Sequence, residues 1–79
     1  MEAEAVTDRT DAVERAVDSE WRPTREIVAR AGFEPTPVNV NSASRRLRAL
    51  ARQGYVERSE EVVPGAMGAH RRAIWRLRP

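Results

Sequence analysis

The stretch from residue 41 to residue 77 limits strongly which folds are open to this chain. Its first part has apolar residues at helical spacing, and Asn41 or Ser42 can cap a helix that runs to about Gln53. The apolar positions are Ala43, Leu47, Leu50 and Ala51. Gly54 follows directly, as expected just after the end of a helix. We therefore predict a helix over residues 41–53, with one side against a core.

The rest of that stretch predicts a β-hairpin. Residues 55–62 are typical of a strand, and residues 64–68 contain the proline and glycines of a loop tip. Residues 71–77 are typical of a returning strand. Alternate residues of this second strand are expected to face inward, namely Ala73, Trp75 and Leu77.

Two further helices are expected upstream. The first spans about residues 7–20 and is broken at residues 21–23, because Pro23 disfavours helical geometry in the residue before it. Thr24 can cap a second helix that starts at Arg25 and ends at Gly32. Residues 33–40 contain two prolines and predict a turn of unusual length before the third helix.

The chain is expected to form one domain. Its 79 residues are too few for two hydrophobic cores, and 41% apolar with 33% charged residues is typical of an ordered, soluble domain. We expect residues 1–6 to be a flexible tail and residues 7–79 to be the folded part. The predicted fold class is mostly α with a small β-hairpin.

Charge is distributed unevenly along the chain. Residues 1–41 hold five arginines and nine acids, a net charge of −4, whereas residues 42–79 hold nine arginines and three acids, a net charge of +6. The nine arginines are Arg45, Arg46, Arg48, Arg52, Arg58, Arg71, Arg72, Arg76 and Arg78. Such asymmetry indicates one surface that meets a polyanion.

The predicted third helix presents polar residues opposite its apolar side. With 100° between successive residues, Ala43, Leu47 and Leu50 fall on one side. The opposite side presents Asn41, Arg45, Arg48 and Arg52. Arginine suits guanine and asparagine suits adenine, so these side chains are expected to meet DNA. The expected DNA-binding residues of the helix are Asn41, Ser42, Ser44, Arg45, Arg48 and Arg52. Of these, Arg52 is placed best for a phosphate.

The predicted hairpin and its flanks offer further contacts. The wing, about residues 63–72, carries His70, Arg71 and Arg72 beside a glycine-flanked tip that can follow a DNA backbone or enter a narrow minor groove. The hydroxyl of Thr24 is expected to bind another phosphate, because helix N-termini favour anions. Three more arginines are expected to widen this patch: Arg58, Arg76 and Arg78.

Three passages carry a resemblance to a known family. They are "REIVARAG" at residues 25–32, "RRLRALARQGYVER" at residues 45–58 and "AIWRL" at residues 73–77. Over about residues 7–78 the chain resembles winged helix-turn-helix transcription regulators of bacteria and archaea. The resemblance implies a third helix in the major groove and a wing on the flanking backbone or minor groove. The stretch between Gly32 and Asn41 is longer and richer in proline than the usual turn.

Several function classes find no support in the sequence. The single histidine, His70, is the one candidate general base for Ser42, Ser44 and Ser59, and no glycine-rich phosphate loop is present, so no catalytic residues are expected. Without cysteine, neither a disulfide framework nor a thiolate metal site can form, and we expect no metal or cofactor. No signal peptide or membrane span is expected in the opening residues, which indicates the cytoplasm.

The expected partner is double-stranded DNA, bound by a transcription regulator that acts as a monomer or as a homodimer. No small-molecule effector is expected, because little chain remains beyond the DNA-binding core. Two other functions stay open. One is a winged-helix protein-interaction module that docks an acidic partner, and the other is RNA or ribosome binding.

Overall fold

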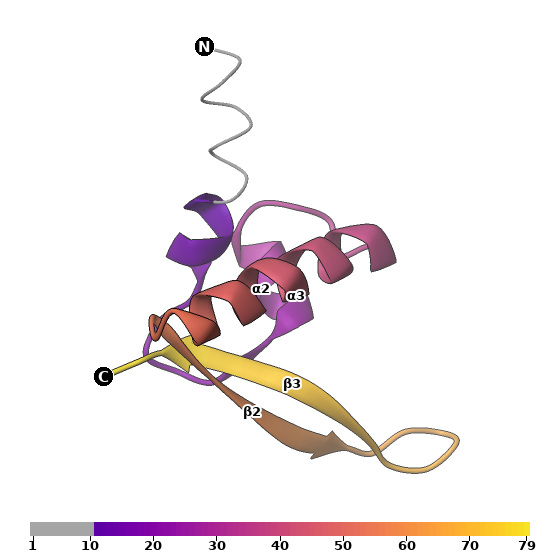
Figure 1. The fold of residues 1–79 in the computed structure, drawn as a ribbon. Coiled ribbons are helices and arrows are strands. Elements are labelled where there is room, and N and C mark those ends of the chain that lie inside the picture. The colour runs from indigo at the N-terminus through magenta and orange to yellow at the C-terminus, as the bar shows by residue number, and fades with distance from the viewer. Residues whose placement is uncertain (1–10) are drawn as a thin grey trace.

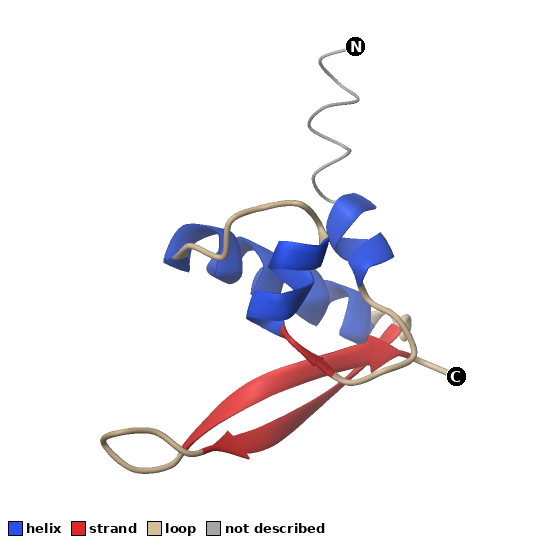
Figure 2. Ribbon diagram, turned by 180° about the vertical axis from the view of Figure 1, so that it is seen from behind, coloured by secondary structure: helices blue, strands red, loops and turns tan. Residues whose placement is uncertain are grey.

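The computed structural model describes residues 11–79, which form three helices followed by a C-terminal hairpin in a winged-helix-like arrangement (Figures 1 and 2). The order along the chain is the first helix (residues 11–16), β1 (Arg22–Pro23), α2 (Thr24–Arg30), α3 (Pro37–Arg52), β2 (Val56–Val63) and β3 (His70–Leu77). The predicted class, mostly α with a small hairpin, is confirmed. The predicted tail over residues 1–6 and the predicted start of the first helix lie outside the described residues.

The first helix is shorter at its C-terminal end than predicted. It ends at residue 16 and not at Glu20. Asp18 explains the early end, because its Oδ1 accepts a hydrogen bond from the backbone N–H of Glu20, an arrangement that competes with helix. The carbonyl oxygen of Asp18 accepts a further bond from the N–H of Leu77 at 2.7 Å. The chain is thereby turned away from the helix axis and tied to the end of β3.

The start of α2 also differs from the prediction. Pro23 occupies the cap position with extended geometry and makes no side-chain cap bond, and Thr24 is the first helical residue. The predicted Thr24 cap is therefore wrong. Gly32 follows the helix with φ +93°, as predicted, and the N–H of Phe33 bonds to the carbonyl of Val28.

The helix α3 begins four residues earlier than predicted, at Pro37. The Oγ1 atom of Thr36 accepts a hydrogen bond from the N–H of Asn39 at 3.2 Å, and so caps the helix. Pro37 suits the first helical position because its missing N–H would have no partner there. The proline-rich stretch that predicted a long turn is in part a helix start, which extends α3 by about 6 Å.

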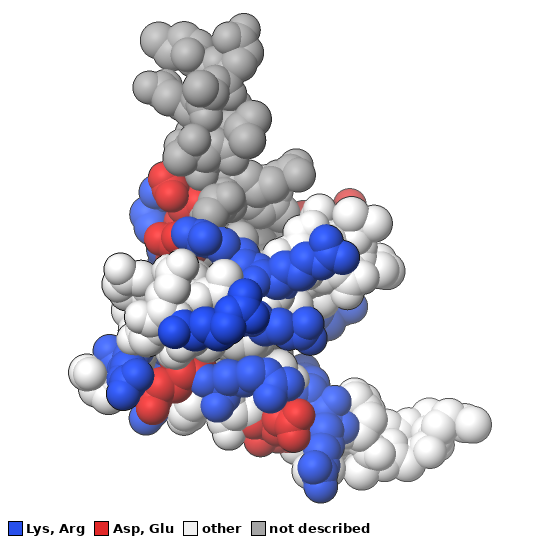
Figure 3. All heavy atoms as spheres, in the orientation of Figure 1, with Lys and Arg blue, Asp and Glu red and all other residues white. Residues whose placement is uncertain are grey.

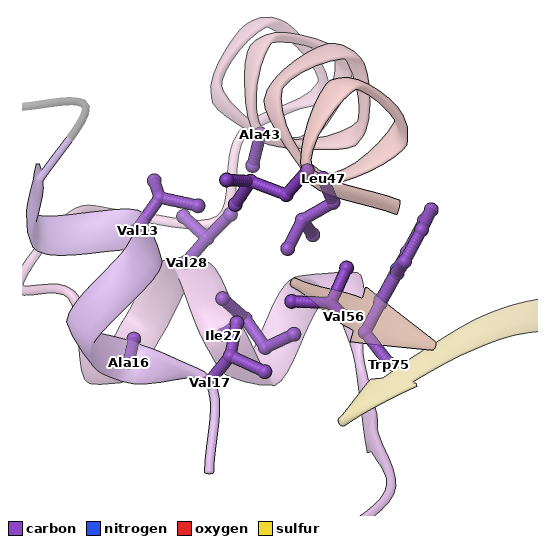
Figure 4. Packing of buried hydrophobic residues seen from close by; sticks show 10 residues of the cluster. Val13, Ala16, Val17, Ile27, Val28, Ala43, Leu47, Val56 and Trp75 are labelled. Carbon is purple, nitrogen blue, oxygen red and sulfur yellow. The ribbon is translucent and has the colours of Figure 1, made fainter. Parts of the chain in front are cut away.

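The hydrophobic core lies between the three helices and the base of the hairpin (Figure 4). Four side chains are almost fully buried: Trp75, Ile27, Leu47 and Val28. The predicted inward positions Ala43, Leu47 and Leu50 of α3 are all buried, so the predicted orientation of this helix is confirmed. The first helix contributes Val13 and Ala16, and Val17 follows directly after it.

The three strands form an antiparallel sheet in the order β1-β3-β2. Residues paired across β2 and β3 point to the same face of the sheet. The face that includes the buried residues Val56 and Trp75 packs against the helices, and we call it the inner face. The opposite face is called the outer face. Leu77 was predicted to be buried, but it is 44% exposed because it is the last residue of β3 and lies at the rim of the core.

An ion-pair network joins β1 to α2 and to the segment that follows the first helix. Arg22 Nη2 lies 2.7 Å from Asp18 Oδ2, and the same guanidinium contacts Glu20 and Glu26. The hydrogen bond from Arg22 lowers the pKa of Asp18 from 3.8 to about 2. This carboxylate therefore stabilises the fold at neutral pH.

The network predicts a specific acid sensitivity. A folded-state pKa below the unfolded one contributes stability that is present above about pH 4 and is lost as the pH falls toward 2. Asp18→Asn is expected to lower the melting temperature at pH 7, and the gap between the two proteins should close near pH 2. Thermal unfolding followed by circular dichroism checks this. An equal gap at both pH values would contradict the assigned role of the Asp18 charge.

Candidate nucleic-acid interface

The exposed side of α3 carries three cations that have no partner among residues 11–79. Arg45, Arg48 and Arg52 are exposed and take part in none of the ion pairs or hydrogen bonds of the described chain. They lie on one side because residues 3, 4 and 7 apart share a face of a helix. Figure 3 shows basic side chains gathered over α3. The helix itself contains no acidic residue.

The N-terminal half of the same side is neutral. Asn41 and Ser42 are exposed and Ser44 is half-buried, so the structure leaves all three predicted residues at the surface to some degree. Val38 lies one turn before Asn41 and is 72% exposed. Sequence reasoning missed Val38 because residues 33–40 were assigned to a turn. The signal that could have found it is Thr36-Pro37, a capping residue followed by a proline suited to the first helical position.

A fourth arginine of α3 faces another direction. Arg46 is half-buried, and its Nη2 donates to Glu14 of the first helix. This ion pair holds the first helix against α3 and takes Arg46 out of the row of free cations. We call Arg45, Arg48 and Arg52 the arginine row.

The basic residues of the hairpin are divided between its two faces. Neighbours in a strand point to opposite sides, so Arg71 lies on the inner face with Arg58, whereas Arg72 lies on the outer face. His70 and Arg76 share the outer face with Arg72. The predicted wing residues His70, Arg71 and Arg72 therefore do not form one surface.

On the outer face the cations are neutralised by direct partners. Arg72 Nε lies 2.5 Å from Glu61, and Arg76 Nε lies 2.8 Å from Glu57, each on the opposite strand. The Arg76 guanidinium also stacks on the ring of Trp21, 4.5 Å from its centroid. These contacts stabilise the hairpin and leave little net positive charge on that side.

On the inner face the ion pairs of the arginines are longer than those on the outer face. The Arg71 side chain is 76% exposed and its Nη1 is 3.8 Å from Glu60. Arg58 lies over the ring of Trp75 at 5.8 Å from the centroid and reaches the same carboxylate at 3.5 Å. Two arginines share one acid here, so the inner face keeps an excess of positive charge beyond the core.

The end of α3, which carries the arginine row, lies next to the start of the hairpin. Gly54 turns the chain between α3 and β2 with φ +86°, and the N–H of Tyr55 bonds to the carbonyl of Leu50. In Figures 1 and 2 the start of α3 and the tip of the hairpin consequently lie toward the same end of the molecule. A long partner that lies along α3 can reach both elements.

Thr24 does not belong to this surface. It is only 8% exposed, and its Oγ1 accepts a hydrogen bond from Trp75 Nε1 at 2.9 Å. The hydroxyl that was expected to bind a phosphate joins α2 to β3 inside the core. We therefore correct this prediction and leave Thr24 out of the interface.

Residues 11–79 were also searched for a metal site and for a membrane-spanning helix. No three side chains of His, Cys, Asp or Glu come together there as metal ligands would. None of the helices within that range combines the length and the apolar character needed to cross a membrane. No family model matches the chain, and no curated protein or solved structure matches it either.

Proposed function

We propose that this domain binds double-stranded DNA, with α3 in the major groove and the inner face of the hairpin on the flanking backbone or minor groove. The observation that carries the proposal is the arginine row, three exposed cations without partners in the described chain, on a helix free of acids. Unpaired cations gain most from phosphate, because no internal ion pair must be broken first. The excess positive charge beside Arg58 and Arg71 extends the same surface.

The dimensions of α3 support this mode of binding. A helix with its side chains is about 10–12 Å across, which matches the roughly 12 Å width of the major groove. With the start at Pro37, the first turns present Val38, Asn41 and Arg45 to base edges. Asparagine is suited to adenine, arginine to guanine, and an exposed apolar group to the thymine methyl. The later arginines of the row then meet phosphates.

A role in transcription regulation is part of the proposal. It is supported by the resemblance of residues 25–32, 45–58 and 73–77 to winged helix-turn-helix regulators, together with the winged-helix-like fold. Such a regulator would act in the cytoplasm of a bacterium or archaeon, where its DNA is accessible. Fold likeness alone does not determine function, so the surface chemistry of α3 carries more weight here.

The test is a fluorescence anisotropy titration of a labelled duplex at several salt concentrations. If about four arginines meet phosphates, the affinity should fall roughly 100-fold between about 50 and 200 mM salt. A structured RNA of matched length and an acidic protein serve as competitors. Absence of duplex binding at low salt would contradict the proposal, and stronger competition by RNA or by the acidic protein would favour those partners instead.

A further inference from the structure

The tip of the hairpin is apolar although the hairpin itself is strongly charged. No residue between Glu61 and His70 carries a charge. Within this stretch Val62 is exposed and Met67 is fully exposed. Figure 3 shows an uncharged end that projects beyond the charged body of the molecule. The apolar side chains at this end are therefore available for contact with a partner.

Met67 lies in the turn at the tip of the hairpin, where its side chain is fully exposed. The N–H of Gly68 bonds to the carbonyl of Gly65 at 3.1 Å, so Met67 is one of the two central residues of a closed turn. Gly68 has φ +108°, and a side chain at Gly65 would come within 3.0 Å of the Gly68 oxygen. The positive φ favours glycine at position 68, and position 65 leaves little room for a side chain; with Ala66 and Ala69 these glycines keep the tip narrow.

Cations lie directly below this apolar apex. Arg71 and Arg72 follow the loop on opposite faces of the hairpin. Arg72 is paired with Glu61 on the outer face, whereas Arg71 on the inner face is 76% exposed and lies 3.8 Å from Glu60. The apex is therefore apolar, and the exposed Arg71 lies below it on the inner face. The minor groove of duplex DNA has the complementary arrangement, with sugars and base edges at the floor and a row of phosphates along each rim.

On the basis of the proposed function, we propose that the tip inserts Met67 into the minor groove beside the site of α3 and partly opens a base step there. Apolar wedges of this kind unstack bases and bend DNA by roughly 20–90°. The minor groove is only about 6 Å wide, which a turn built from glycine and alanine can approach. The side chain of Val62, on the inner face with Arg71, follows the apex toward the groove wall.

A wedge has a sequence preference that differs from that of a basic tip. Unstacking is easiest at pyrimidine–purine steps such as TA and CA/TG, so these steps should be favoured where the tip lands. A tip that read the groove by charge would favour stiff A-tracts, whose narrow minor groove attracts cations. The flanking sequence therefore distinguishes the two modes.

The test compares the parent with Met67→Ala and Met67→Arg. Duplexes are first selected by the parent from a random pool, and the enriched site is then remade with a TA step or an A-tract at each flank. Affinity is measured by anisotropy, and bending by energy transfer between dyes at the duplex ends. These substitutions lie at a fully exposed position, so the fold should persist, and circular dichroism checks this.

The parent should bend the duplex and prefer the TA flank by about 5-fold or more. Met67→Ala should lose the preference and most of the bend, and Met67→Arg should shift the preference to the A-tract. A parent that binds without bending, or a Met67→Ala variant that bends equally well, would overturn the wedge and leave the proposed function standing. No duplex binding at all would overturn both. A Met67-dependent change in oligomeric state without bending would assign the tip to a second copy of the chain instead.

Discussion

Replacing Trp75 with alanine is expected to lower the free energy of unfolding by about 3–5 kcal/mol, the usual cost of removing a large buried aromatic side chain. Trp75 is 1% exposed and lies where α2, α3 and the sheet meet. For a chain of this length the whole free energy of unfolding is of the order of 4–12 kcal/mol. The variant should therefore be marginally folded, as urea unfolding followed by circular dichroism will show.

Two milder substitutions separate packing from hydrogen bonding at this position. Thr24→Val keeps the volume but leaves the buried indole N–H of Trp75 without an acceptor, at a cost of about 1–3 kcal/mol. Trp75→Phe keeps an aromatic ring and leaves the Thr24 hydroxyl unpaired. Both should fold and both should be less stable than the parent. A Trp75→Ala variant as stable as the parent would contradict the placement of β3 against the helices.

The double substitution Arg45→Ala with Arg48→Ala is expected to weaken duplex binding by about 100-fold or more at moderate salt. Each arginine lost from a groove contact costs roughly 1–3 kcal/mol, and a factor of ten corresponds to about 1.4 kcal/mol. Because Arg48 is assigned to a phosphate, the slope of log affinity against log salt should also become shallower by about 0.9. Neither side chain has a partner in the described part of the protein, so the fold should be unaffected.

A matched control distinguishes position from overall charge. Arg15 is exposed on the first helix and, like Arg48, makes no ion pair within the described residues. Arg15→Ala and Arg48→Ala change the net charge equally, but only Arg48 belongs to the arginine row. Arg48→Ala should weaken binding far more. Equal losses for the two single variants would mean that the protein attracts DNA only by its general charge.

Periodicity predicted the side of α3 that packs and the side that faces outward. Leu47 and Leu50 are buried, and the arginine row is exposed. The spacing of residues in a helix is fixed, so the positions of the apolar residues determine which side packs against the core. The order of helices and hairpin was predicted for a similar reason, since glycines mark the ends of its elements. These signals are local, because each lies within a few residues of the helix face or element end that it predicts.

The predictions were wrong where the structure depends on residues far apart in the sequence or on competing local signals. The cap at Thr36 moved the start of α3 and placed Val38 in the exposed surface of this helix, although two prolines favoured a turn. The hydroxyl of Thr24 was assigned to the surface because its partner, Trp75, lies far away in the sequence. The division of Arg71 and Arg72 between two faces follows from strand alternation, but which face is inner depends on packing against the helices.

We propose that the arginine row and the inner face of the hairpin bind one duplex together. Amide chemical shifts of isotope-labelled protein, recorded as a short duplex is added, test it most directly. We predict changes at Arg45, Arg48 and Arg71, with Glu57 and Arg76 on the outer face unaffected. Changes confined to the outer face, or no changes on adding duplex, would contradict the account.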